Sequence, residues 1–172
     1  MGSFRDAIKS AMTEYLDELK QKLDGLTEAE LTWQASLDTN TIIWLVWHMA
    51  RVEDNWINER VGQGQTVWES GGWSQKLEIT EEGNGYGQAM DQVRSFPSRD
   101  IDGIVAYHDA VREAGFKVID SLTDADMDAT REQTRNRGPI EISWILGHVV
   151  VEESQHLGQI ALVRGMTRGL NG

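Results

Sequence analysis

The sequence predicts an all-α protein, a four-helix bundle with a long loop after its second helix. Four long segments carry apolar residues three and four positions apart, which is the spacing of an amphipathic helix. Alternation of apolar and polar residues with a period of two is hard to find, so no sheet is required. The length of 172 residues fits a single domain, residues 1–172, with a full core. We expect the helices to run up and down, or with one crossover.

The first two long helices are predicted at about 4–24 and 41–60. Gly25 ends the first helix, because glycine readily takes the backbone conformation that follows a helix. Residues 27–30 have the spacing of a capping box and predict a short helical turn. Residues 38–40 supply cap residues before the second helix.

Glycines mark a long irregular connection after the second helix. They are Gly62, Gly64, Gly71, Gly72, Gly83, Gly85 and Gly87. A connection of this length is often a functional loop. A modest helix is predicted at about 86–95, before Pro97.

The third and fourth long helices are predicted at about 99–122 and 139–164. A polar connection, residues 123–138, separates them. Pro139 suits the first turn of the last helix, because the N–H that proline lacks has no partner there. Gly165 is expected to end that helix.

Charge and composition exclude several classes of function. The net charge of −12 argues against binding to a phosphate backbone, which needs clusters of Lys and Arg. The chain contains no Cys, which excludes disulfides, thiolate ligands and a cysteine nucleophile. No apolar stretch approaches the roughly 18 residues that span a membrane, and the N-terminal residues lack the apolar core of a signal peptide. We therefore expect a cytoplasmic protein with no nucleic-acid partner and no membrane partner.

The run from His148 to His156 is the most informative stretch of the chain. His148, Glu152 and His156 recur every four residues, and such positions lie on one face of a helix. Glu152 could therefore bind one divalent metal together with either histidine. All three cannot bind it, because His148 and His156 would lie roughly 12 Å apart along the helix. A further ligand must come from another helix, and His48, in an apolar run of the second helix, is the best candidate.

Each of these residues also has an ordinary structural interpretation. A lone histidine on an apolar helix face, such as His48, is more often a core residue. A buried Glu152 would need a partner, and a salt bridge to Arg51 or Arg164 could supply it. Glu153 is interpreted as a solvated neighbour. The aromatic neighbours are interpreted as core packing rather than a cofactor box: Trp44, Trp47 and Trp144.

Other polar residues lie near the proposed ligands in the helical pattern. His148 could replace His156 as a ligand, or orient the site from one turn away. His108 could orient the ligands from outside, shuttle a proton or belong to the core, and the core is our first interpretation. The candidates for binding substrate, each with an equally ordinary structural role, are Arg51, Asn55 and Gln159.

Two motifs resemble a known family. The run Trp44-Leu-Val-Trp-His48-Met-Ala-Arg-Val-Glu-Asp-Asn-Trp56 resembles the second-helix signature of the DinB/YfiT-like metalloproteins. The run Trp144-Ile-Leu-Gly-His148-Val-Val-Val-Glu152-Glu-Ser-Gln-His156-Leu-Gly-Gln159 resembles their fourth-helix signature. The helix lengths and the long loop match as well, so the resemblance covers nearly the whole chain. It implies a DinB-like four-helix bundle that holds a divalent metal with His48, Glu152 and His156, and it leaves His148 outside the ligand set.

The resemblance also implies a chemistry. Glu152, where many members have histidine, is similar to the branch of mycothiol-dependent maleylpyruvate isomerase, and it implies zinc, with nickel as the alternative. The metal would activate a low-molecular-weight thiol, such as mycothiol or bacillithiol, for attack on a small-molecule electrophile, and Arg51 could hold an acidic group. A homodimer is implied too. The alternatives are a metal-dependent hydrolase and a non-catalytic metal protein that binds a small ligand or stress signal. No side chain is identified as catalytic.

Overall fold

Four long helices form the body of the protein in the computed structural model, which describes residues 3–97, 100–134 and 138–169. They are α1 (Phe4–Leu23), α3 (Ile42–Glu53) with its continuation η1 (Asp54–Val61), α7 (Ile101–Ser121) and α8 (Ile142–Arg168). The predicted four-helix bundle is confirmed. Within the described ranges, no helix is both long enough and apolar enough to cross a membrane.

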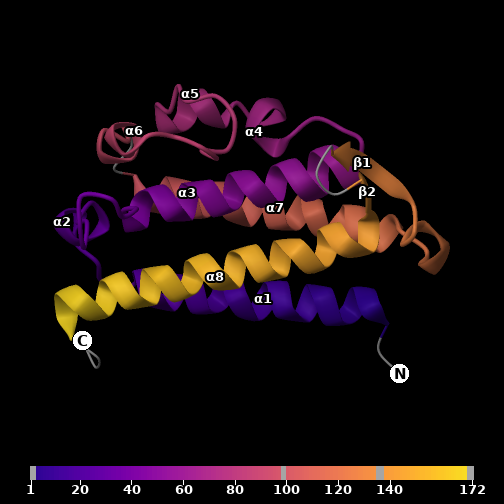
Figure 1. Cartoon of the computed structure of the whole chain (residues 1–172), viewed down its shortest axis with the longest axis horizontal. Coiled ribbons are helices and arrows are strands. Elements are labelled where there is room, and N and C mark those ends of the chain that lie inside the picture. Colours follow the sequence, from indigo (N-terminus) through magenta and orange to yellow (C-terminus); the bar gives the residue numbers. More distant parts are fainter. Residues whose placement is uncertain (1–2, 98–99, 135–137, 170–172) are drawn as a thin grey trace.

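The bundle contains one crossover. Figure 1 shows α1 and α8 running in one direction and α3 and α7 running in the other. The chain leaves the end of η1, passes over the outer side of the bundle and returns to the starting end of α3 before α7 begins. As a result α3 and α7 are parallel neighbours, while α8 lies antiparallel beside α3. This antiparallel pair carries the residues proposed as metal ligands.

The second long helix is the most deeply buried element. Every residue of α3 is buried, and its first turn is capped by Thr41, whose side chain accepts a hydrogen bond from the backbone N–H of Trp44. The helix continues without a break into η1, a π-helical stretch in which, for example, Gly62 N–H bonds to Ile57 C=O. Wide turns of this kind are frequent at functional sites. The continuous helix ends near the predicted position, residue 60.

In its described residues, 62–97 and 100, the crossover contains only short helices. These are α4 (Val67–Ser70), α5 (Trp73–Leu77) and α6 (Met90–Arg94), and a further short helix, α2 (Glu28–Leu31), joins α1 to α3. The capping box predicted at residues 27–30 is present at α2, while α6 is shorter than the predicted helix at 86–95. The crossover is tied to the bundle by Asp54, whose carboxylate accepts hydrogen bonds from the backbone N–H groups of Val67 and Trp68, each at 2.9 Å.

A small sheet takes the place of part of the predicted polar connection and of the first residues of the predicted fourth helix. After η2 (Asp124–Asp126), the antiparallel strands β1 (Thr130–Thr134) and β2 (Gly138–Glu141) form a hairpin at the start of α8. Pro139 lies in β2 rather than in the helix, which begins at Ile142. The short two-stranded ribbon tolerates a proline, and β1 has no apolar alternation that would have revealed it.

The last helix ends later than predicted. The predicted start of the third long helix falls on residues outside the described ranges. Gly165 lies inside α8, which continues to Arg168, because Arg168 is held by Glu30 and the glycine with positive φ that ends the helix is Gly169. Residues 98 and 99, where the predicted third helix begins, lie outside the described residues; α7 is described from Ile101.

Candidate metal centre

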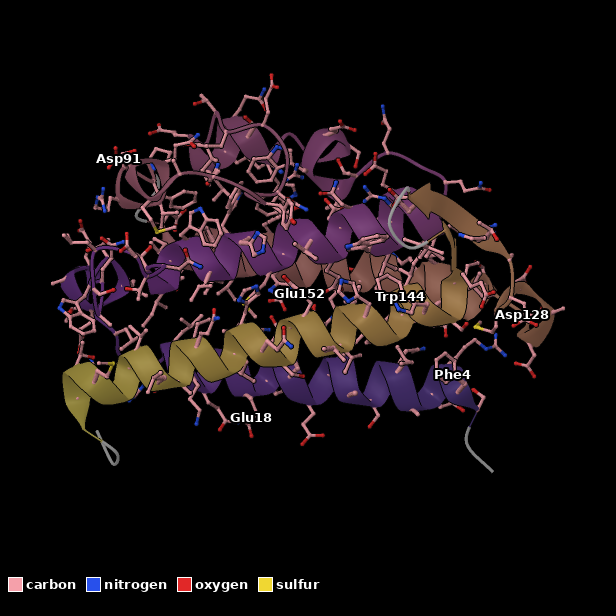
Figure 2. The ribbon with its side chains drawn as sticks, in the orientation of Figure 1. Phe4, Glu18, Asp91, Asp128, Trp144 and Glu152 are labelled. Carbon is pink, nitrogen blue, oxygen red and sulfur yellow. The ribbon has the colours of Figure 1, made fainter. Side chains whose placement is uncertain are left out.

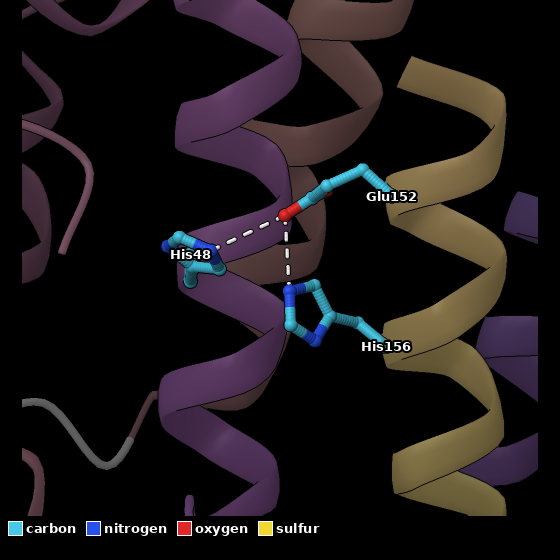
Figure 3. Close-up of side chains that lie close together, drawn as sticks. All are labelled: His48, Glu152 and His156. Atoms are coloured by element: carbon cyan, nitrogen blue, oxygen red, sulfur yellow. Dashed lines mark ion pairs between the residues drawn. The ribbon is translucent and has the colours of Figure 1, made fainter. Parts of the chain in front are cut away.

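Three donor side chains meet between α3 and α8. His48 projects from α3, and Glu152 and His156 project from successive turns of α8. One carboxylate oxygen of Glu152 lies 3.2 Å from Nε2 of His48 and 3.0 Å from Nε2 of His156. Figure 3 shows this oxygen between the two imidazole rings. One donor atom from each residue lies within 4.8 Å of the others, so a single ion could contact all three.

The electrostatics of the site suit a cation. Burial raises the pKa of Glu152, but hydrogen bonds with His156 and His48 outweigh it and lower the pKa to about 2. The other carboxylate oxygen, Oε2, is buried without a hydrogen-bond partner. A buried ionised oxygen without a partner is costly, and a metal ion would satisfy it. The residues present therefore fit a divalent metal.

The salt-bridge interpretation of Glu152 is not supported by the positions of the two arginines. Arg51 lies 3.9 Å from Asp54, donates a hydrogen bond to the carbonyl of Gly83, and packs over the ring of Trp68. Arg164, about three turns further along α8, donates to the carbonyl of Lys22 in α1. Glu152 therefore has histidines, rather than guanidinium groups, as its neighbours.

Both histidine rings are held from outside by a second contact. Nδ1 of His48 lies 2.5 Å from the backbone carbonyl of Asn84, and Nδ1 of His156 lies 2.8 Å from Oε1 of Gln159. Each partner oxygen can only accept, so each Nδ1 donates, and Nε2 is the nitrogen left to face Glu152 and a metal ion. Metal-binding histidines are commonly oriented in this way. Gln159 thus acts on the site through His156 rather than by lining the cavity.

A cavity of about 1050 Å³ adjoins the three donors. Residues four apart on two helices form its long walls, and residues of the crossover and of the two strands also line it. From α3 and η1 the walls include Trp44, His48, Val52, Trp56 and Arg60; from α8 they include Trp144, His148, Glu152 and His156. Figure 2 labels Trp144 and Glu152 along α8, and Glu18 on the exposed outer side of α1. The donors therefore face a space large enough for a small molecule.

The tryptophans divide between the core and this cavity. Trp47 is fully buried, as expected for core packing. Trp44 is also buried in the core and Trp144 packs against it, in agreement with the expected core packing, but both in addition line the cavity. Nothing in the sequence separates these cases, because all three stand in apolar helical runs.

His148 lies on the cavity wall, one turn before Glu152. Its ring stacks on that of Trp144, with centroids 4.4 Å apart, and meets Trp56 edge-on at 5.8 Å. It is absent from the groups of side chains that converge closely enough to hold one ion in the described ranges. This placement agrees with the ligand set His48, Glu152 and His156.

Two residues expected to bind substrate stand apart from the cavity. Arg51 is buried against the crossover, and Asn55 donates a hydrogen bond to Glu59. Neither is among the residues that line the cavity. The charged pair on its wall is instead Arg60 with Glu132, whose Nε and Oε2 atoms lie 2.7 Å apart. Helical periodicity could not reveal this pair, because Glu132 comes from the hairpin.

A second cluster of charged side chains is fully enclosed behind the site, and it corrects the interpretation of Glu153. This residue has no exposed surface and is not a solvated neighbour. It lies 3.8 Å from Nε2 of His108 and 3.4 Å from Arg112, which also binds both carboxylate oxygens of Glu53 at 2.8 Å. His108, also fully buried, lies 3.1 Å from Glu53. The core interpretation of His108 agrees with this position.

Glu53, His108 and Glu153 also converge closely enough for a metal, but Arg112 already supplies the cation. Burial raises the pKa of Glu53, yet the charge and hydrogen bonds of Arg112 outweigh it and hold that pKa well below its ordinary value. Burial and the charge of Glu53 raise the pKa of Glu153 well above its ordinary value. The cluster therefore favours a negative charge on Glu53, beside the guanidinium, and the neutral form of Glu153. In the sequence, Arg112 and Glu153 both stand at inward positions beside the apolar stripes of their helices, and this pattern could have indicated their burial.

Comparisons with known proteins agree with this architecture. The profile of a protein family described as Mycothiol-S-transferase matches residues 7–169. The chain is also similar to a crystal structure described as the conserved protein of a locus from Enterococcus faecalis, with a TM-score of 0.83 and 15% identity, covering 96% of this chain and 97% of that one. At this identity the likeness shows the fold alone. No curated protein matches the chain.

Proposed function

Because the chain belongs to the mycothiol S-transferase family, which confirms its resemblance to the DinB-like metalloproteins, we propose that it is a metal-dependent thiol S-transferase. Its substrates would be a low-molecular-weight thiol, of which mycothiol is the first candidate, and a small-molecule electrophile. The metal would be zinc, bound by His48, Glu152 and His156.

One observation carries the proposal: two imidazoles and one carboxylate converge on the wall of a cavity of about 1050 Å³. Three protein ligands leave a coordination position open, which is typical of catalytic rather than structural zinc. A zinc ion in this place would lower the pKa of a thiol or a water molecule bound at that position. The thiol must come from a cosubstrate, because the chain has no cysteine.

Residues of the chain would charge, orient and shield the zinc ion and its open coordination position. Glu152, with its lowered pKa, is ionised throughout the neutral range and supplies the negative charge. Asn84 and Gln159 hold the Nε2 atoms of the two histidines toward Glu152. The indoles of Trp44, Trp56 and Trp144 provide apolar cavity wall, which excludes water from the reacting groups.

The decisive variant is Glu152→Gln, which keeps the shape of the side chain and removes its charge. We expect it to lose bound zinc and thiol transfer, with an affinity loss beyond the roughly 10–100-fold typical of changes outside the ligand set. Zinc content by elemental analysis measures this directly. Glu153→Gln is the matched control, because it makes the same change one residue away and should retain zinc. Full zinc occupancy in Glu152→Gln would defeat the proposed ligand set.

A thiol-dependence assay then tests the reaction class. Zinc-loaded protein is mixed with a generic electrophile in the presence and absence of several low-molecular-weight thiols. We expect consumption of the electrophile only when a thiol is present. Turnover without thiol would instead support the hydrolase alternative, in which water takes the place of the thiol. If the protein binds zinc but consumes the electrophile neither alone nor with any of the thiols, the result would favour the non-catalytic, ligand-binding alternative.

A homodimer stays a prediction of the family resemblance. Light scattering of the purified protein tests it, and a mass near 19.4 kDa, that of one chain, would contradict it.

A further inference from the structure

The segment from Gly83 to Gln88 is attached to one face of α3 at three successive points. Nε1 of Trp44 donates to Oε1 of Gln88 at 2.8 Å, Nδ1 of His48 meets the carbonyl of Asn84 at 2.5 Å, and Nε of Arg51 donates to the carbonyl of Gly83 at 2.9 Å. The three α3 residues are spaced by four and three positions, so they lie along one side of the helix. The middle attachment is the one that reaches a proposed metal ligand.

That middle contact determines which nitrogen of His48 faces the cavity. A backbone carbonyl can only accept a hydrogen bond, so Nδ1 of His48 must donate. Nε2 is then the nitrogen that faces Glu152, 3.2 Å away, and a metal ion would bind there in place of the Nε2 proton. Without the carbonyl of Asn84, either tautomer and either ring orientation would become available to His48.

The close approach of this segment to α3 depends on a missing side chain. Gly85 has a φ of +89°, and a Cβ atom there would lie 2.8 Å from the ring of Trp44, 2.9 Å from that of Trp47 and 3.4 Å from Nδ1 of His48. Trp47 is fully buried and cannot move aside cheaply. Any side chain at this position would push the segment away from α3 and lengthen the bond to His48.

We propose that the segment Gly83–Gln88 is a positioning element of the metal centre, which holds His48 in its metal-binding tautomer and orientation and which only glycine at position 85 permits. The proposal rests on the proposed function, since it assigns this role toward His48 as a zinc ligand. Apart from this role, the segment only lines the cavity.

The chain offers a matched control for the key variant. Gly87 has a φ of +80°, close to that of Gly85, but a Cβ atom there would meet nothing within 4 Å. Gly85→Ala and Gly87→Ala therefore share the cost of a positive φ, and only Gly85→Ala adds the collision with Trp44, Trp47 and His48. A difference between the two variants isolates the effect of displacing the segment from α3.

The first measurement uses metal-free protein and the ¹⁵N and ¹H signals of the His48 Nδ1–H group. We expect a hydrogen-bonded Nδ1–H in the wild type and in Gly87→Ala, seen as a downfield ¹H signal in slow exchange with water, and loss of that signal in Gly85→Ala. Identical Nδ1–H signals in Gly85→Ala and Gly87→Ala would overturn the proposal. This readout requires no zinc and no activity, so it remains decisive even if the thiol-transferase function fails.

The second measurement is zinc affinity, determined by competition with a chromogenic chelator. Gly85→Ala should bind zinc about tenfold or more weakly than Gly87→Ala, the scale seen when a partner that orients a ligand is lost. Equal affinities would also overturn the proposal. If Gly85→Ala loses its helical circular dichroism, Gln88→Ala replaces it. That variant removes the attachment at Trp44 without a collision, and it should shift both readouts in the same direction; unchanged readouts would then refute the role of the segment.

Discussion

Glu53 and Glu153 should respond in opposite ways to the same substitution, although both are fully buried beside Arg112. Glu53 accepts two hydrogen bonds of 2.8 Å from Arg112 and one of 3.1 Å from His108. Glu153 makes one longer contact of 3.4 Å with Arg112, and its Oε2 atom has no hydrogen-bond partner. The geometry thus makes Glu53 the counter-ion of Arg112, and Glu153 the protonated member of the pair.

Glu53→Gln should destabilise the fold strongly. It removes the charge that balances a guanidinium only 5% exposed, and breaking a buried pair in this way costs about 3–5 kcal/mol. Glu153 can ionise in compensation, but it offers one contact of 3.4 Å in place of two of 2.8 Å, so we expect the lower end of this range. At about pH 4, where the Glu153 carboxyl is largely neutral in the unfolded chain as well, Glu153→Gln exchanges one neutral group for another and should change the free energy of unfolding by about 1 kcal/mol or less.

Urea unfolding of both variants, with chelator present to remove any metal, measures this contrast through tryptophan fluorescence. In thermal melts each kcal/mol corresponds to about 2–4 °C for a chain of this size, so Glu53→Gln should melt on the order of 10 °C below the wild type. Equal losses in the two variants, or a larger loss in Glu153→Gln, would refute the assignment of the charge to Glu53.

The pH dependence gives an independent check. The pKa of Glu153 is raised in the folded state, so its contribution to stability is present below the unfolded pKa and is lost as the pH rises toward the folded pKa. Glu153→Gln removes that dependence, and the variant should gain stability relative to the wild type as the pH rises above about 5.

Two further predictions concern the metal centre. His156→Ala should empty the zinc site while His148→Ala leaves it loaded, as measured by elemental analysis, and the reverse result would place the ligand one turn away along α8. Zinc affinity, measured by chelator competition, should fall as the pH drops from about 8 to about 6. Although burial lowers the pKa of His156, its hydrogen bond with Glu152 outweighs burial and raises that pKa above the ordinary value, so protons compete with zinc in this range; an affinity independent of pH would contradict it.

Local periodicity was sufficient to predict the bundle. The apolar stripes at spacings of three and four residues placed all four long helices, because a helix must bury its apolar face whatever lies opposite. The same spacing set Glu152 and His156 on one face of α8. The paired strands at residues 130–134 and 138–141 escaped prediction because they lack apolar alternation, and Gly165 did not end its helix because Arg168, further along α8, is bound to Glu30.

The sequence by itself determined the fold class and a short list of candidate metal ligands, because both follow from the identity and spacing of residues within single helices. The pairing of His48 with Glu152, the enclosure of Glu153 beside Arg112, and the carbonyl of Asn84 at His48 were decided only by the tertiary structure. Each of these contacts joins residues more than thirty positions apart. Their geometry depends on how helices and the crossover pack against one another, and no local pattern encodes that packing.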